Sequence, residues 1–154
     1  MAAYFTDSSA AAKRYLSEIG SDWIKGLFTA DPPNNFFAVA TIGVEVVAAI
    51  TRRARGGAIS QADAVSISTL FLADLPANYR IVPVTDALLS EAIRLVQSYT
   101  LRGYDAIQLA AASEVGRLRV AAGLPPIYFV SADNELNTAA RGEGLSVDDP
   151  NAHP

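Results

Sequence analysis

The sequence has 154 residues, of which 51% are hydrophobic and 18% are charged, and its formal net charge is −4. This length predicts one domain over residues 1–154, and the composition is typical of a globular rather than a disordered chain. The acidic balance argues against broad coating of nucleic acid by a basic surface. The absence of cysteine excludes disulfides and thiolate metal sites.

The sequence carries no recognisable targeting or membrane segment. The start, Met1–Asp7, lacks a basic region followed by an apolar run and does not resemble a secretory signal. The most apolar stretch, Phe36–Ile50, is interrupted by polar residues and is shorter than the roughly 20 residues that a membrane-spanning helix needs. We therefore expect a cytoplasmic protein with no membrane contact.

Short apolar runs alternate with helical patterns along the chain. In chain order, the expected elements are a strand at Ala2–Thr6, helices at Ser8–Ser17 and Asp22–Thr29, a strand at Phe36–Ala40, a helix capped by Thr41 that runs to about Arg55, a helix capped by Ser60 that ends before Pro76, a strand at Arg80–Val84, a helix from Thr85 to about Tyr99, a helix at Tyr104–Ala122, a strand at Ile127–Ser131, a helix at Asn134–Arg141 and a strand at Leu145–Val147. This alternation predicts an α/β fold with a mostly parallel sheet covered by helices on both faces. Ligands in such folds bind at the carboxyl ends of the strands.

Two acids follow predicted strands. Asp7 comes directly after the first strand, and Asp133 lies two residues beyond the strand that ends at Ser131. Both are expected at the carboxyl edge of the sheet. An ordinary structural role is open to each, because Asp commonly caps the helix that follows it.

Two further acids lie in unusually apolar helices. Glu45 is the only charged residue between Thr41 and Arg52, in a helix that is apolar nearly all round and is therefore expected to be buried. Asp105 begins a helix whose same-face neighbours, Leu109 and Ala112, are apolar. A carboxylate on a packed face is costly unless it is paired or binds a metal. The alternatives are a narrow solvent-facing stripe for Glu45 and stabilisation by the helix dipole for Asp105.

If the four acids converge, their mutual repulsion favours a bound cation. Two like charges about 4 Å apart repel by roughly 4 kcal/mol at an effective dielectric of 20. The single histidine, His153, leaves no material for a Ser-His-Asp apparatus or a His-rich zinc site. Oxygen ligands alone favour Mg²⁺ or Mn²⁺.

Four segments in this order resemble the PIN-domain family, and in particular its VapC-like toxin branch. They are Tyr4–Ala10, Val44–Val46, Leu101–Ala106 and Phe129–Asp133. Each segment alone is a weak signal, and together they extend the resemblance over nearly the whole chain. The resemblance implies a three-layer α/β/α sandwich with a central, mostly parallel sheet.

The resemblance also implies a function. Asp7, Glu45, Asp105 and Asp133 would be the metal-binding and catalytic acids, and Ser9 would support the site beside the first acid. The implied activity is Mg²⁺- or Mn²⁺-dependent endonuclease cleavage of RNA. The implied partners are the RNA substrate, a cognate antitoxin protein and a second copy of the chain in a homodimer.

Two cationic side chains lie close in sequence to these acids, and we expect Lys13 and Arg102 to contact flanking phosphates. Many members of the family carry a further acid or Asn after the fourth acid. Asn134 and Glu135 are both candidates here. The sequence therefore leaves open whether one or two metal ions bind.

The main alternative is a PIN-like scaffold that binds RNA or protein without cutting. Other α/β classes fit less well. An aspartyl phosphatase needs a second Asp where Ser9 stands, and a nucleotide-binding domain needs a Gly-rich loop that this sequence lacks. The sequence does not distinguish one RNA class from another, nor RNA from DNA.

Overall fold

The computed structural model describes residues 1–154 and contains a five-stranded sheet in which every neighbouring pair is parallel. The strands are β1 (Ala3–Thr6), β2 (Asn35–Val39), β3 (Tyr79–Val82), β4 (Tyr128–Val130) and β5 (Ser146–Asp148). Their order across the sheet is β3-β2-β1-β4-β5. The order reverses at β1, so the carboxyl ends of β1 and β4 border the crevice where α/β folds bind ligands.

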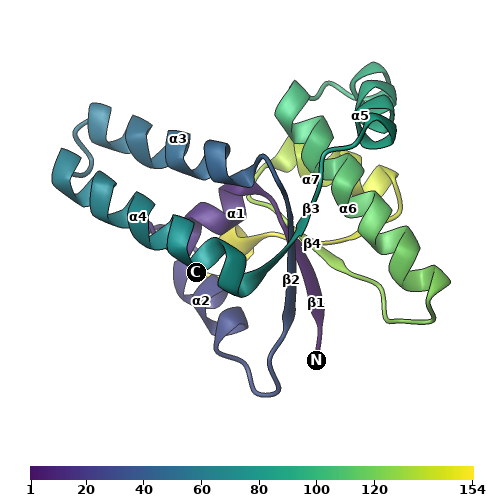
Figure 1. Cartoon of the computed structure of the whole chain (residues 1–154), viewed down its shortest axis with the longest axis horizontal. Helices are drawn as coiled ribbons and strands as arrows, with labels where there is room; N and C mark the ends of the chain where they lie inside the picture. Colours follow the sequence, from purple (N-terminus) through teal and green to yellow (C-terminus); the bar gives the residue numbers. More distant parts are fainter.

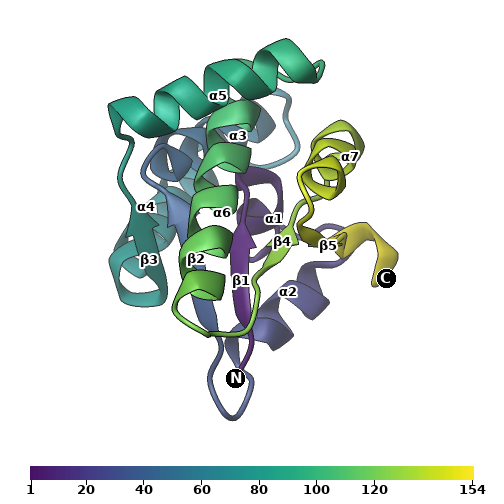
Figure 2. The same cartoon turned by 90° about the vertical axis from the view of Figure 1, so that its right-hand side faces the viewer.

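Helices cover both faces of the sheet, which gives the predicted three-layer α/β/α arrangement (Figures 1 and 2). One layer holds α1 (Ser8–Lys13), α2 (Ser21–Phe28), α3 (Ile42–Arg55) and α4 (Gln61–Asn78). The other holds α5 (Asp86–Ser98), α6 (Gly103–Ala121) and α7 (Asn134–Gly142), and a 3₁₀ turn, Pro150–Ala152, follows β5. Helices α3 and α4 lie side by side and extend beyond the sheet (Figure 1).

Strand side chains alternate between two cores, as parallel strands buried on both faces require. Phe5 and Phe129 point toward α5, α6 and α7, and their rings stack with centroids 6.0 Å apart. Phe36 and Ala38 point to the opposite face, toward α1, α3 and α4. This alternation locks the strand register, because a one-residue slip would exchange the two faces.

Two expected helix ends were wrong. The first helix ends at Lys13 rather than Ser17, and residues 14 and 15 continue it only as a turn. Helix α4 continues past Pro76 to Asn78 instead of ending before the proline. Pro76 lies in the last turn, where its missing N–H removes one i→i−4 hydrogen bond, and the helix ends two residues later.

The interpretation of α3 as a helix buried nearly all round was also wrong. Ile42, Val46 and Ile50 are buried at four-residue spacing, whereas Val44 is 67% exposed. The helix therefore has one packed face, and Glu45 lies beside it, half-buried. No helix is both long and apolar enough to cross a membrane.

Candidate metal-binding and catalytic pocket

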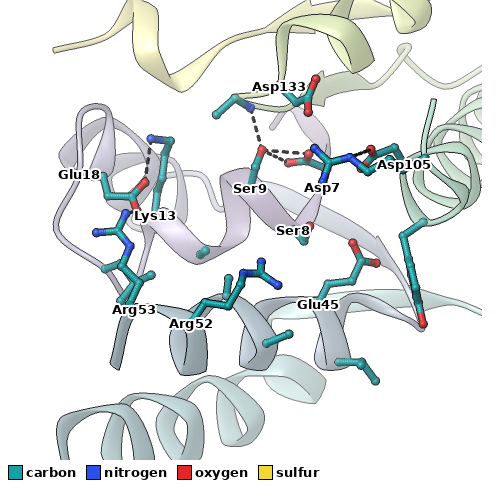
Figure 3. A pocket seen from close by; sticks show the side chains of 18 residues that line it. Asp7, Ser8, Ser9, Lys13, Glu18, Glu45, Arg52, Arg53, Asp105 and Asp133 are labelled. Carbon is teal, nitrogen blue, oxygen red and sulfur yellow. Dashed lines mark hydrogen bonds and ion pairs between the residues drawn. The ribbon is translucent and has the colours of Figure 1, made fainter. Parts of the chain in front are cut away.

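Seven of the candidate residues line one pocket of about 730 Å³ near the carboxyl ends of β1 and β4: Asp7, Ser9, Lys13, Glu45, Arg102, Asp105 and Asp133. The two candidates for a further metal ligand, Asn134 and Glu135, do not line it. Figure 3 shows Asp7, Asp105 and Asp133 near one end of the pocket, with the Glu45 carboxylate on α3 directed toward them. Lys13 and Arg53 lie toward the other end together with Glu18, and Arg52 lies between the two groups. The pocket therefore has an acidic end and a basic end.

Asp7 is the most enclosed of the acids, with only 3% of its surface exposed. Its Oδ1 accepts hydrogen bonds from the Ser9 hydroxyl at 2.7 Å and from the Ala10 backbone N–H at 2.8 Å. Its Oδ2 accepts one from the Ser131 hydroxyl at 2.8 Å. Burial raises the pKa of Asp7 to about 7; these hydrogen bonds oppose the rise, and the charge of Asp105 adds to it.

Asp133 is held by the same hydroxyl. Its backbone N–H donates to Ser131 Oγ at 3.1 Å, and its own carboxylate accepts from the N–H of Leu136 at 3.0 Å. The structural alternative for Asp7 and Asp133 is therefore correct, because each caps the helix that follows it, α1 and α7 respectively. Capping uses Oδ1 of each carboxylate, and both side chains still line the pocket.

Glu45 faces the other acids from α3. Its Oε1 accepts hydrogen bonds from the Thr41 hydroxyl at 3.0 Å and from Nε2 of Gln108, on α6, at 2.9 Å. Burial raises the pKa of Glu45, and the charge of Asp105 raises it further, while the hydrogen bonds lower it. Thr41 occupies the N-cap position of α3 but makes no side-chain capping bond; it holds Glu45 instead.

Asp105 interacts electrostatically with each of the other three acids, since its charge raises the pKa of Asp7 and Glu45 and the charge of Asp133 raises its own. Burial raises its pKa, as do the charges of Asp133 and Glu135, whereas Arg102 lowers it. Arg102 Nε lies 3.7 Å from Asp105 Oδ2, and the Arg102 side chain is 88% exposed. An exposed pair of this kind contributes little to stability, so the guanidinium is available to other anions.

The ammonium group of Lys13 is not free to bind a phosphate, because it already has partners within the protein. Its ammonium donates to Glu18 at 3.1 Å and to the carbonyl of Ile19 at 2.9 Å, and the residue is 5% exposed. Burial lowers the pKa of Lys13. Glu18 also pairs with Arg53, so both of these cations already have an internal carboxylate partner.

The donor set fits a hard divalent cation in its chemistry. The acids and hydroxyls around Asp7 offer only oxygen, which Mg²⁺ and Mn²⁺ prefer. The single histidine is bound to Asp148 and stacked on Trp23, and it does not line the pocket. In this conformation, however, no three acidic side chains are arranged closely enough to hold one ion together.

The sequence interpretation missed two residues of the site. Ser131, which is fully buried, joins Asp7 to the backbone of Asp133. Gln108 is also fully buried and holds Glu45, while its own Oε1 has no partner. Both carried a signal in the sequence: Ser131 directly follows β4, and Gln108 is a polar residue in an apolar run, three residues after Asp105.

No protein-family model and no curated protein matches the chain. Solved structures do match over most of its length. The chain is similar to PAE2754 from Pyrobaculum aerophilum, with a TM-score of 0.61 and 18% identity over 98% of this chain and 91% of that one. It is similar to VapC20 from Mycobacterium tuberculosis, a sarcin-ricin loop cleaving toxin, with a TM-score of 0.60 and 18% identity over 88% of this chain and 94% of that one.

A third similar structure is that of VapBC2 from Rickettsia felis, bound to a DNA fragment from their promoter. The TM-score is 0.59 and the identity 9%, over 96% of this chain and 98% of that one. Taken with the parallel sheet and its two helical layers, these similarities show that the chain has the fold of VapC-like PIN domains. The expected fold is therefore confirmed.

Proposed function

We propose that this protein is a divalent-metal-dependent endoribonuclease and the toxin of a toxin–antitoxin pair. The observation that carries the proposal is the gathering of Asp7, Glu45, Asp105 and Asp133 in one pocket at the carboxyl edge of a parallel sheet. The fold supports it, since VapC20, which has the same fold, is described as cleaving the sarcin-ricin loop. The same fold can carry different activities, so the four acids of the pocket, rather than the fold, point to a nuclease.

Asp7 and Asp105 are the acids that we assign to a metal ion first. Each has a raised pKa, and the charge of Asp105 contributes to the rise at Asp7. A cation between them would relieve both costs. Mg²⁺ commonly uses only one or two carboxylates and completes its shell with water and substrate phosphate oxygens. The absence of a three-acid cluster is therefore compatible with Mg²⁺ or Mn²⁺ held by two acids.

The chemistry that a divalent ion supplies at such a site is neutralisation of the phosphate charge and activation of water for in-line attack. The protein residues would do the remaining work. Glu45, which accepts hydrogen bonds from Thr41 and Gln108, would orient or deprotonate the attacking water. Ser9 holds both oxygens of Asp7, and exposed Arg102 contacts a flanking phosphate. Lys13 would contact a phosphate only after its ion pair with Glu18 breaks.

The decisive test is cleavage of a mixed pool of structured RNAs in Mg²⁺, in Mn²⁺ and in EDTA. The Glu45→Gln/Asp105→Asn double variant is compared with Asp31→Asn/Glu114→Gln, which changes the charge equally but touches neither the pocket nor any ion pair. We expect discrete metal-dependent products from the wild type and the control, and none from the pocket variant. If the folded wild type gives no products, the non-cleaving binding module is favoured. A parallel assay with DNA shows whether the protein cleaves DNA instead of RNA.

The proposed partners are a cognate antitoxin and a second copy of the chain. The antitoxin is supported by the similarity to VapBC2. Helix α4 carries the exposed apolar side chains of Val65 and Leu70, which a protein partner would cover. Co-expression with the product of a neighbouring gene and light scattering of the purified chain test the two partners separately. Loss of cleavage in the co-purified complex would support the antitoxin, and a monomeric mass would exclude the homodimer.

A further inference from the structure

A second hollow, of about 820 Å³, lies between α3 and α4 and adjoins the acidic pocket. We name it the α3–α4 groove, and its lining residues are Ala40, Gly43, Val44, Val47, Ala48, Thr51, Arg52, Arg55 and Leu72. Val44, Ala48 and Arg52 line both hollows. The two hollows are therefore neighbours along one face of α3, and Arg52 is the charged residue at their junction.

The cations around the two hollows differ in whether they already have a partner. Lys13 and Arg53 both pair with Glu18, and Arg102 pairs with Asp105. Arg52 and Arg55 are exposed and form no ion pair with any acid of the protein. The charges of these two arginines are thus free to bind an anion from outside.

The position of the two arginines is also specific. They are three residues apart on α3 and both line the groove, so they lie on one side of the helix, with Cβ atoms about 5–6 Å apart. Cations near a helix C-terminus are favoured by its dipole, which accounts for basic residues in the last turn of α3. The dipole does not account for their placement over a largely apolar hollow that adjoins the pocket of the four acids.

We propose that Arg52 and Arg55 bind consecutive backbone phosphates of single-stranded RNA, whose bases lie over the apolar floor of the α3–α4 groove. A strand bound in this way leads directly from the groove into the pocket, because Arg52 lines both. The choice of RNA rests on the proposed function. Phosphates match the guanidinium geometry, and the largely apolar lining of the groove suits the flat faces of unpaired bases.

The test measures how RNA binding depends on salt, in EDTA so that the RNA stays intact. The probe is a fluorescein-labelled single-stranded oligoribonucleotide of about twelve nucleotides, within the range of single-strand binding sites. Each phosphate contact on a single strand contributes about 0.7 to the slope of log K against log salt, so Arg52→Ala/Arg55→Ala is expected to reduce that slope by about 1.4. Arg52→Lys/Arg55→Lys keeps both charges and is expected to retain most of it.

The matched control is Arg117→Ala/Arg141→Ala, which removes two exposed arginines that form no ion pair and line neither hollow. Circular dichroism and thermal unfolding check the fold of each variant. An alanine pair with the slope of the wild type, a control with an equal loss, or a wild type that does not bind the RNA would each overturn the proposal. If the alanine pair keeps the wild-type slope while the wild type cleaves RNA, the groove proposal fails but the proposed nuclease stands. If the alanine pair has a reduced slope while the wild type cleaves no RNA, the groove binds RNA but the protein is not the proposed nuclease.

Discussion

The hydroxyl of Ser131 donates to Oδ2 of Asp7 at 2.8 Å and so joins the carboxyl ends of the neighbouring strands β4 and β1. The hydroxyl oxygen of Ser131 also accepts a hydrogen bond from the backbone N–H of Asp133 at 3.1 Å. Asn137 in turn donates to the Ser131 carbonyl at 2.8 Å. One small side chain therefore sets the relative position of two of the four acids.

Replacing Ser131 by alanine tests this role. The N–H of Asp133 would lose its partner and Asp7 would lose a donor, so we expect the unfolding free energy to fall by about 1–3 kcal/mol. RNA cleavage should fall by about 10–100-fold, the usual cost of removing a group that orients a metal ligand. Urea unfolding and initial cleavage rates measure the two effects. Ser98→Ala, an exposed position on α5, is the control, and full activity in Ser131→Ala would contradict the assignment.

Asp7 predicts a dependence of stability on pH. Its pKa is raised from 3.8 to about 7 on folding, so the folded protein holds the proton more tightly than the unfolded chain does. The cost of ionising Asp7 is absent below about pH 4, grows as the pH rises to about 7 and is then constant. At 1.36 kcal/mol per pKa unit its upper limit is roughly 4 kcal/mol.

Asp7→Asn removes this cost, although the amide hydrogen-bonds less well with the surrounding donors. Without divalent ions we expect the variant to be more stable than the wild type by about 1–3 kcal/mol at pH 8, with no gain near pH 4. Urea unfolding in EDTA at the two pH values measures this. Asp31→Asn, which is exposed, should show no such difference. If Asp7→Asn were less stable than the wild type at pH 8, the prediction would be wrong, because the hydrogen bonds to the ionised Asp7 carboxylate would then offset the cost of burying its charge.

Adding Mg²⁺ should reverse the ranking of the wild type and Asp7→Asn. An ion that binds only the folded protein at 100 times its dissociation constant contributes about 2.7 kcal/mol. For a chain of this size that is a rise in Tm of roughly 5–10 °C. We expect the rise in the wild type and little of it in Asp7→Asn or Asp105→Asn. Scanning calorimetry with Mg²⁺, against NaCl of equal ionic strength, separates binding from screening; equal shifts in all three proteins would place the ion elsewhere.

The sequence allowed prediction of features with a local cause. The inner strands β1, β2 and β4 were found because both faces of the sheet are covered there, which makes each of them a short apolar run. Asp7 and Asp133 were placed correctly at the sheet edge because Asp7 directly follows β1 and Asp133 comes three residues after the end of β4. The end of α4 was mispredicted by a few residues, because the helix stops two residues after Pro76 rather than before it.

Contacts between distant segments were beyond the reach of sequence patterns. Ser131 lies 124 positions from Asp7, and Gln108 lies 63 from Glu45. A pattern along the chain states which face a residue occupies, but not what lies opposite that face. For the same reason Lys13 was read as a phosphate ligand, because its closeness to Asp7 in sequence gave no sign that Glu18 folds back to pair with it.

Gln108 offers a way to separate positioning from folding. Its Nε2 holds Glu45 at 2.9 Å, while its Oε1 is buried without a partner. Gln108→Met keeps the volume and removes both the bond and the orphaned oxygen, so the unfolding free energy should change by less than about 1 kcal/mol. Cleavage should nevertheless fall about tenfold or more, in kcat rather than in KM, because Glu45 loses its orientation.

A second substitution at Gln108 gives a readout that a purely structural role would not produce. Gln108→Glu sets a carboxyl against Glu45, whose pKa burial already raises, and the like charge raises it further. The pH profile of kcat should therefore move upward by about one unit, whereas Gln97→Glu, exposed on α5, should leave it in place. If Gln108→Met kept full activity and Gln108→Glu kept the wild-type profile, Glu45 would not depend on Gln108, and the base of the reaction would have to be sought among the other acids of the pocket.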